Sequence, residues 1–324
     1  MYMPVRPFGS LPAVINAVTN KIFIKFNVEG IMKPIIVTTD SHSCISPKRA
    51  DELGIRVLPM PFYIEDKCYL ENVSLSREQF FEKLISGAEV STSQPSPSSL
   101  FELWDELLLE YEQIVHIPIS SGLSGSCEMA QAFSMQEEYR DRVFVVDNGR
   151  VSTPLYRSVL DALELIDEGY SAYEIKNILE ASKGNAVIYV AVDDLKYLKR
   201  GGRVSATTAA IATALNIKPV LKFDIGTLDT YKKCRGFKNA RKTMIEAMKN
   251  DFETKFKEYY DRGEINLLAA SSASDEVTED WINEIKEAFP GMEVLCEPLS
   301  FGLACHIGPD GLGIACSCRP KRFR

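Results

Sequence analysis

The chain has 324 residues, of which 45% are hydrophobic and 25% are charged, and its formal net charge is −8. This length accommodates two domains with cores of their own, and the composition excludes a disordered chain. The acidic balance argues against nucleic acid as a partner, and the basic stretch at the end of the sequence, RPKRFR, is predicted to be a frayed, solvated tail.

Eight cysteines are scattered along the sequence without a CxxC pair or the spacing of a metal site. This usage is typical of a reduced, cytoplasmic protein, and we predict no bound metal. No stretch reaches the roughly 18 uncharged apolar residues of a membrane-spanning helix. The first clear strand begins just after Met32, so we expect residues 1–31 to be an upstream extension without a fold.

The first half of the chain alternates strands with helices. Apolar, β-branched runs predict strands at 34–39, 55–64, 113–119 and 142–146. Caps and apolar stripes predict helices at 47–53, 98–111 and 124–139, and another that opens at Ser76. Residues 87–99 are predicted to be a polar loop. The alternation predicts a doubly wound, mostly parallel α/β domain over residues 32–155.

The second half has a different pattern. Helices are predicted at 154–168, 172–182, 194–199, 207–215, 239–260 and 276–289. Strands are predicted at 185–192, 265–271 and 292–298, with a hairpin formed by 218–223 and 228–233 and a last strand in the tail. A hairpin among crossover units predicts a mixed-sheet α/β domain over residues 156–324, with a seam near residue 155.

Three segments rich in hydroxyl groups lie at or beside the carboxyl ends of predicted strands, where open α/β sheets bind ligands. They are residues 39–41, 91–94 and 120–124. Several hydroxyl donors suit a single carboxylate, and none of the three segments contains a Lys or Arg. We therefore predict a neutral cage that holds a carboxylate rather than a multiply charged phosphate.

The three histidines differ in their surroundings. His116 lies inside a predicted strand and is expected to be a core residue, while His42 lies in the loop after the first strand. His306 precedes the turn Gly308-Pro309-Asp310-Gly311 and is a candidate site residue.

An alternative function is a serine hydrolase that uses Ser124 and His306. Residues 122–126, GLSGS, nearly match the G-x-S-x-G elbow in a strand–turn–helix setting. The mismatch is Ser126, which stands where the elbow requires glycine, and the acid partner stays open among Asp193, Asp194, Asp224 and Asp275. Binding is therefore favoured. The sequence contains no Walker A, HExxH or dinucleotide-binding motif.

Several motifs, in order, resemble those of the DegV family, whose better-understood members are fatty-acid-binding subunits of bacterial fatty-acid kinase. The resemblance covers Met32 to about Ser317. It rests on VTTDS at 37–41, TSQPSP at 92–97, SSGLSGS at 120–126, LKYLKRGGRVS at 195–205, IKPVL at 217–221, KCRGFKNA at 233–240 and HIGPDGLGI at 306–314.

The resemblance implies two α/β domains with one long-chain fatty acid between them, its acyl chain buried in a tunnel. Carried over by motif, the carboxyl cage would consist of Thr92, Ser93, Ser121, Ser124 and His306. The chain would be a carrier without cofactor or catalysis of its own. An ATP-binding kinase subunit would convert the presented carboxyl into an acyl phosphate for phospholipid synthesis, and transient membrane contact fits that role.

Lys199, Arg200 and Arg203 are expected to contact this partner kinase. Reversing the charge of Arg203 is then expected to stop phosphorylation and leave lipid binding intact. Two departures from the family pattern stand out. Residues 147–152, DNGRVS, insert an arginine and lack a later glycine, and Asp310 is expected to place a carboxylate near the site.

Overall fold

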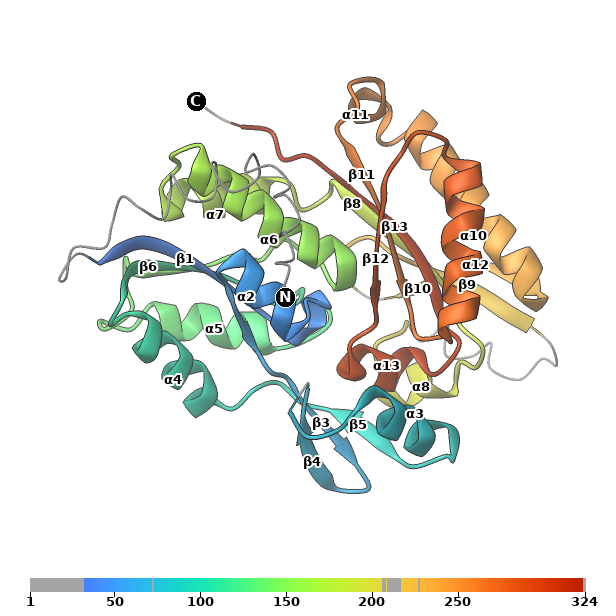
Figure 1. Ribbon diagram of the computed structural model, residues 1–324, viewed down its shortest axis with the longest axis horizontal. Helices are drawn as coiled ribbons and strands as arrows, with labels where there is room; N and C mark the ends of the chain where they lie inside the picture. The colour runs from blue at the N-terminus through green and yellow to red at the C-terminus, as the bar shows by residue number, and fades with distance from the viewer. Residues whose placement is uncertain (1–31, 72, 206–207, 209–216, 227, 323–324) are drawn as a thin grey trace, which may run out of the picture.

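We analysed a computed structural model of the protein, which describes residues 32–71, 73–205, 208, 217–226 and 228–322 (Figure 1). The expected extension 1–31 and all but residue 208 of the predicted helix 207–215 lie outside these residues. Within the described ranges, no helix is long and apolar enough to cross a membrane.

A four-stranded parallel sheet forms the first layer, in the order β2-β1-β6-β7. Its strands are β1 (Lys33–Asp40), β2 (Arg56–Leu58), β6 (Tyr111–Ile117) and β7 (Val143–Val145). The surrounding helices are η1 (Ser41–Ser43), α2 (Pro47–Leu53), α4 (Pro97–Leu107), α5 (Ser126–Ser134), α6 (Ser152–Asp167) and α7 (Ala172–Ala181). Because β1 is buried on both faces, Ile36 packs with residues of α4 and α5, whereas its neighbour Val37 packs with residues of α6. The predicted doubly wound layer is confirmed.

A small antiparallel sheet, in the order β4-β3-β5, was not predicted. It consists of β3 (Pro61–Ile64), β4 (Lys67–Leu70) and β5 (Val90–Thr92), and α3 (Arg77–Ile85) packs on it. The strand predicted over 55–64, for which Pro59 and Pro61 indicated an edge position or an irregular course, is two short strands, and β2 is at the edge of its sheet. The chain leaves the parallel sheet after Leu58 and starts a new strand at Pro61. The loop predicted over 87–99 contains β5, which pairs with β3 and not with a neighbour in sequence.

The second large sheet has six strands in the order β10-β9-β8-β13-β11-β12. These are β8 (Ala186–Ala191), β9 (Ile217–Phe223), β10 (Asp229–Arg235), β11 (Ile265–Ser271), β12 (Val294–Pro298) and β13 (Leu312–Cys318). The β11–β12 pair is parallel and the other pairs are antiparallel, so the predicted mixed sheet is confirmed. Its helices are α8 (Lys196–Gly201), α10 (Gly236–Glu253), α11 (Lys257–Asp261), α12 (Asp275–Ala288) and α13 (Phe301–Ile307).

The two faces of this sheet have different partners. Helices α10 and α12 cover one face, where Met244 and Trp281 are fully buried (Figure 1). The other face contributes Val190 and Phe223 to the same hydrophobic core as Val37 of the parallel sheet. Helix α6 lies between the sheets and contacts strands of both. The predicted seam near residue 155 falls inside this helix. Residues of both sheets belong to one hydrophobic core.

A buried arginine joins the two halves of the chain through hydrogen bonds. Arg150 is 1% exposed and donates hydrogen bonds to Ser158 of α6 and Ser317 of β13. The end of the chain is also held, because Arg322 donates to both carboxylate oxygens of Glu168 at 2.7 and 2.8 Å. The frayed tail predicted for RPKRFR is therefore wrong through residue 322. The tail is held because Arg322 pairs with Glu168 at the end of α6.

Candidate functional site

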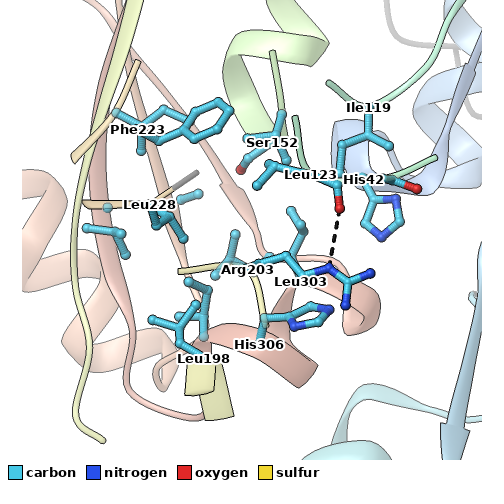
Figure 2. A pocket seen from close by; sticks show the side chains of 18 of the residues that line it. His42, Ile119, Leu123, Ser152, Leu198, Arg203, Phe223, Leu228, Leu303 and His306 are labelled. Atoms are coloured by element: carbon cyan, nitrogen blue, oxygen red, sulfur yellow. Dashed lines mark hydrogen bonds between the residues drawn. The ribbon is translucent and has the colours of Figure 1, made fainter. Parts of the chain in front are cut away.

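A cavity lies between the carboxyl ends of the parallel strands and the inner face of the six-stranded sheet (Figure 2). The loops after β1, β6 and β7 contribute one wall, and β8, β9, β11 and α13 contribute the other. It encloses about 900 Å³ between atoms, including the part that opens to solvent. Most lining side chains are apolar, among them Ile119, Leu123, Ile188, Val190, Phe223 and Leu303.

Thr92 and His306 form a hydrogen-bonded pair in this cavity. The Thr92 hydroxyl oxygen lies 2.8 Å from His306 Nε2. The other ring nitrogen, Nδ1, is buried without a partner among the described residues, and a Cβ at Gly201 would lie 1.9 Å from it. Because a buried N–H without an acceptor costs about 1–3 kcal/mol, we assign the ring proton to Nε2. His306 then donates to Thr92, whose own proton is free to point into the cavity.

His306 carries no charge near neutral pH. Burial, together with the positive charge of Arg203 and the nearby His42, lowers the pKa of His306 to about 3. A neutral histidine can orient a hydroxyl but cannot balance an anion. Any positive charge at this end of the cavity must therefore come from another residue.

Among the described residues that line the cavity, Arg203 is the one Lys or Arg. It is half-buried and lines the cavity, its Nε donates to the carbonyl oxygen of Leu123 at 3.3 Å, and a second guanidinium nitrogen donates to the carbonyl of Gly201. Figure 2 shows the guanidinium between His42 and His306. The neutral cage predicted from the sequence is therefore wrong. The three hydroxyl-rich segments contain no Lys or Arg, but Arg203, in the turn after α8, donates to Leu123 of the segment 120–124.

The predicted serines do not all reach the cavity. Ser124 lines it, and its oxygen accepts from the backbone N–H of Ser126 at 3.2 Å, which leaves the hydroxyl proton free. Ser93 lines it from an exposed position after β5. Ser121 is not among the lining residues, because its hydroxyl donates to Asp147 Oδ2 at 2.7 Å. Four of the five predicted cage residues therefore line the cavity, and Ser121 does not.

Of the three predicted partner-contact residues, one lines the cavity and two do not. Lys199 and Arg200 are exposed on α8, whereas Arg203 faces inward. Asp310 is exposed and does not line the cavity, so the carboxylate expected near the site is absent from it. Ser152, the last residue of the unusual 147–152 segment, does line it. Ser152 has a φ of +58°, in the left-handed region where glycine is favoured.

His42 is a cavity residue that the sequence reasoning missed. It is 6% exposed, and its Nδ1 lies 3.3 Å from Asp40 Oδ1. The signal that could have found it is its position, because it directly follows the VTTDS motif at the carboxyl end of a buried parallel strand.

The hydrolase arrangement is not assembled. His306 Nε2 is engaged by Thr92 rather than by Ser124, and no carboxylate of the described residues accepts from Nδ1. Of the four candidate acids, Asp193 pairs with Lys218 and Asp224 pairs with Lys255. The described residues also contain no group of three or more His, Cys, Asp or Glu side chains that could hold a metal.

Comparison with known proteins identifies clear relatives. A family model described as an uncharacterised protein of the DegV family matches residues 34–319. Protein DegV of Bacillus subtilis (strain 168) is 30% identical over 287 residues, which are 88% of this chain and 99% of that protein.

Solved structures agree over the same length. A fatty-acid-binding DegV family protein from Thermus thermophilus superposes with a TM-score of 0.77 at 28% identity, over 88% of this chain and 99% of that one. DegV of Bacillus subtilis, described as a fatty acid binding protein, superposes with a TM-score of 0.76 at 27% identity over the same shares.

Proposed function

The chain belongs to the DegV family, and from that premise we propose that it binds one long-chain fatty acid in the cavity between its two large sheets. The carboxyl group lies at the Thr92–His306 end. The observation that carries this proposal is that the described residues lining the cavity divide into a mostly apolar wall and a polar end, and that Arg203 is the one Lys or Arg among them. An aliphatic chain with a single anionic head matches that division.

The two parts of the ligand would contribute differently to its affinity. Each buried methylene contributes about 0.8 kcal/mol, so the apolar wall supplies most of the binding free energy. The Thr92 and Ser124 hydroxyls and the Arg203 guanidinium donate to the carboxylate and fix its direction. His306 holds the Thr92 hydroxyl in place and thus acts as a positioning residue.

We further propose that the chain presents this carboxyl to a separate ATP-binding kinase, which forms an acyl phosphate. One carboxylate oxygen attacks the terminal phosphorus of ATP, ADP leaves, and the partner supplies the phosphoryl-transfer chemistry. This chain contributes orientation and charge balance alone. Exposed Lys199 and Arg200, close in sequence to the cavity-lining Arg203, are suited to contact that partner. Such a role places the protein in the cytoplasm.

The binding proposal is tested with delipidated full-length protein. Native mass spectrometry should record one bound palmitate per chain, and calorimetry should give tighter binding of palmitate than of its methyl ester, which lacks the anionic head. Thr92→Val should weaken palmitate binding by about tenfold, the loss expected for one hydrogen bond to a charged group.

Thr38→Val is the matched control, because Thr38 makes the same 2.8 Å contact to a histidine, His116, outside the cavity. It should leave palmitate affinity unchanged. No bound palmitate after careful delipidation and titration would refute the proposal. Equal affinity for acid and ester would refute the placement of the carboxyl group.

A further inference from the structure

The small antiparallel sheet is bonded to the helix that carries His306. Glu71 directly follows β4 of this sheet and is 3% exposed. Its Oε1 accepts from the backbone N–H of Phe301 at 2.6 Å, and its Oε2 accepts from that of Gly302 at 3.1 Å. One buried carboxylate therefore accepts from the first two N–H groups of α13, which have no acceptor within the helix itself.

A second charged side chain contacts the same end of α13, which lies beside α3 and the small sheet (Figure 1). Arg77, the first residue of α3, donates through Nη1 to the carbonyl oxygen of Leu299 at 3.4 Å. Phe301 stacks on Phe80 of α3, with ring centroids 4.6 Å apart. Aromatic packing holds the helix against its neighbour, whereas directed hydrogen bonds fix its position along its own axis. Glu71, which bonds to two N–H groups, is the stronger of the two charged contacts.

The other end of α13 carries His306, whose ring bonds to Thr92 of β5. Because β4 and β5 belong to the same small sheet, both ends of α13 are bonded to one structural unit. His306 is only five residues after Phe301, about 7.5 Å along the helix axis, so a shift at one end of α13 reaches the other. A shift of about 1 Å along the Thr92 contact takes its 2.8 Å distance beyond hydrogen-bond range.

We propose that Glu71 is a positioning residue of the carboxyl site, and that it acts through α13 on the hydrogen bond between Thr92 and His306. The proposal rests on the fatty-acid binding proposed above and adds a residue that does not line the cavity. Without the two bonds of Glu71, α13 shifts, His306 no longer orients the Thr92 hydroxyl, and the carboxyl group of the ligand loses a donor. The acyl chain keeps its contacts with the apolar residues of β8 and β9.

The test compares the affinities of palmitate and its methyl ester for delipidated full-length Glu71→Gln. The amide keeps the shape of the side chain, but its single oxygen can accept from only one of the two N–H groups. We expect palmitate to bind about tenfold more weakly, as in Thr92→Val, and the ester to bind unchanged. In the double variant Glu71→Gln, Thr92→Val, palmitate affinity should equal that of Thr92→Val alone, because both changes remove the same oriented donor.

Ser274→Ala is the matched control. Ser274 caps α12 by accepting from the backbone N–H of Val277 at 3.4 Å, and α12 covers the face of the six-stranded sheet that is turned away from the cavity. This variant should lower the stability of the protein and leave the acid-to-ester affinity ratio unchanged. An unchanged ratio in Glu71→Gln overturns the proposal, and so does a further tenfold loss in the double variant.

A second readout needs no ligand. The Nε2 proton of His306, bonded to Thr92, should give a low-field proton NMR signal that Glu71→Gln loses and Ser274→Ala keeps. If Glu71→Gln does not fold, Glu71→Asp replaces it: this variant keeps the charge with a shorter reach and should lower the acid-to-ester ratio about threefold. An unchanged ratio there overturns the proposal. If the unmodified protein does not bind palmitate, the fatty-acid binding is refuted, and the NMR signal still tests the action of Glu71 on His306.

Discussion

His116 and His306 make the same hydrogen bond in two different regions of the molecule. Each has a ring nitrogen 2.8 Å from a threonine hydroxyl, Thr38 for His116 and Thr92 for His306. Burial lowers the pKa of His116 to about 4, and burial with a nearby cation lowers that of His306 to about 3. Both are therefore neutral histidines that orient a threonine.

The regions differ in what lies beyond the threonine. His116 is 2% exposed and packs edge-on against the Trp104 ring in the core of the parallel sheet. His306 borders a cavity that also contains Arg203, Ser124 and His42. A histidine–threonine pair is thus a structural element in one place and part of a candidate binding site in the other. The cavity and the cation make that difference.

The cation gives the largest predicted effect. Arg203→Glu should lower palmitate affinity on the order of 100-fold, because a carboxylate replaces a guanidinium beside the bound carboxylate and removes a desolvated charge pair. Calorimetry on delipidated protein measures it, and Arg203→Lys should recover part of the loss. This reverses the expectation from sequence that lipid binding would survive a charge reversal at this position.

A double charge reversal at Lys199 and Arg200 is the matched comparison. Both side chains are exposed, so palmitate affinity should stay within about twofold, while kinase-dependent acyl phosphate formation should fall. If Arg203→Glu bound palmitate normally and lost phosphorylation alone, Arg203 would belong to the partner surface and not to the carboxyl cage.

The next effect concerns pH. Both histidines have folded-state pKa values below the ordinary value of 6.5, so the unfolded chain binds more protons as the pH falls below 6.5. The free energy of unfolding should therefore drop on acidification, by roughly 2 kcal/mol for each histidine between pH 7.5 and pH 5. Denaturant melts of His116→Gln and His306→Gln should each show a shallower pH dependence than the unmodified protein.

Bound palmitate should separate the two histidines. An anionic head beside His306 favours its charged form and should raise its pKa, whereas His116 is outside the cavity and should not respond. Titration of the histidine ring protons by NMR, with and without palmitate, measures both. Equal shifts at the two sites would show that the carboxyl group does not lie next to His306.

The sequence predicted the parts of the fold that local pattern determines. Buried β-branched runs identified β1 and β6, and alternation with helices identified the parallel layer. It failed where pairing was non-local: β5 lies in a hydroxyl-rich stretch and is a strand because β3 is beside it. The predicted helix 239–260 is interrupted between α10 and α11. The sequence did not predict this break, because neither a proline nor a glycine marks it.

The same limit applies to the site. Motif positions identified Thr92, Ser124 and His306, which the structure brings together. They gave Arg203 only as a partner contact and did not reveal that it lines the cavity from the turn after α8, or that His42 lies against Gly302 of α13. Arg203 and Leu123 are 80 residues apart in sequence, and His42 and Gly302 come from opposite ends of the chain, so no local pattern encodes either contact.

The smallest predicted effect distinguishes two serines of one turn, Ser121 and Ser124. The Ser124 hydroxyl faces the cavity, so Ser124→Ala should weaken palmitate binding by about five- to tenfold through one lost hydrogen bond. Ser121 donates to Asp147, which also pairs with Lys183 at 2.6 Å. Ser121→Ala should therefore lower the free energy of unfolding by about 1 kcal/mol and leave palmitate affinity unchanged.

Calorimetry with palmitate and denaturant melts on the same two variants separate these outcomes. Ser124 accepts from Ser126 N–H, so its removal should also cost a little stability, and only the affinity loss is diagnostic. If Ser121→Ala weakened palmitate binding as much as Ser124→Ala, the turn would act as a unit that positions backbone N–H groups. Backbone N–H groups, as well as side-chain donors, would then distinguish the region around His306 from the region around His116.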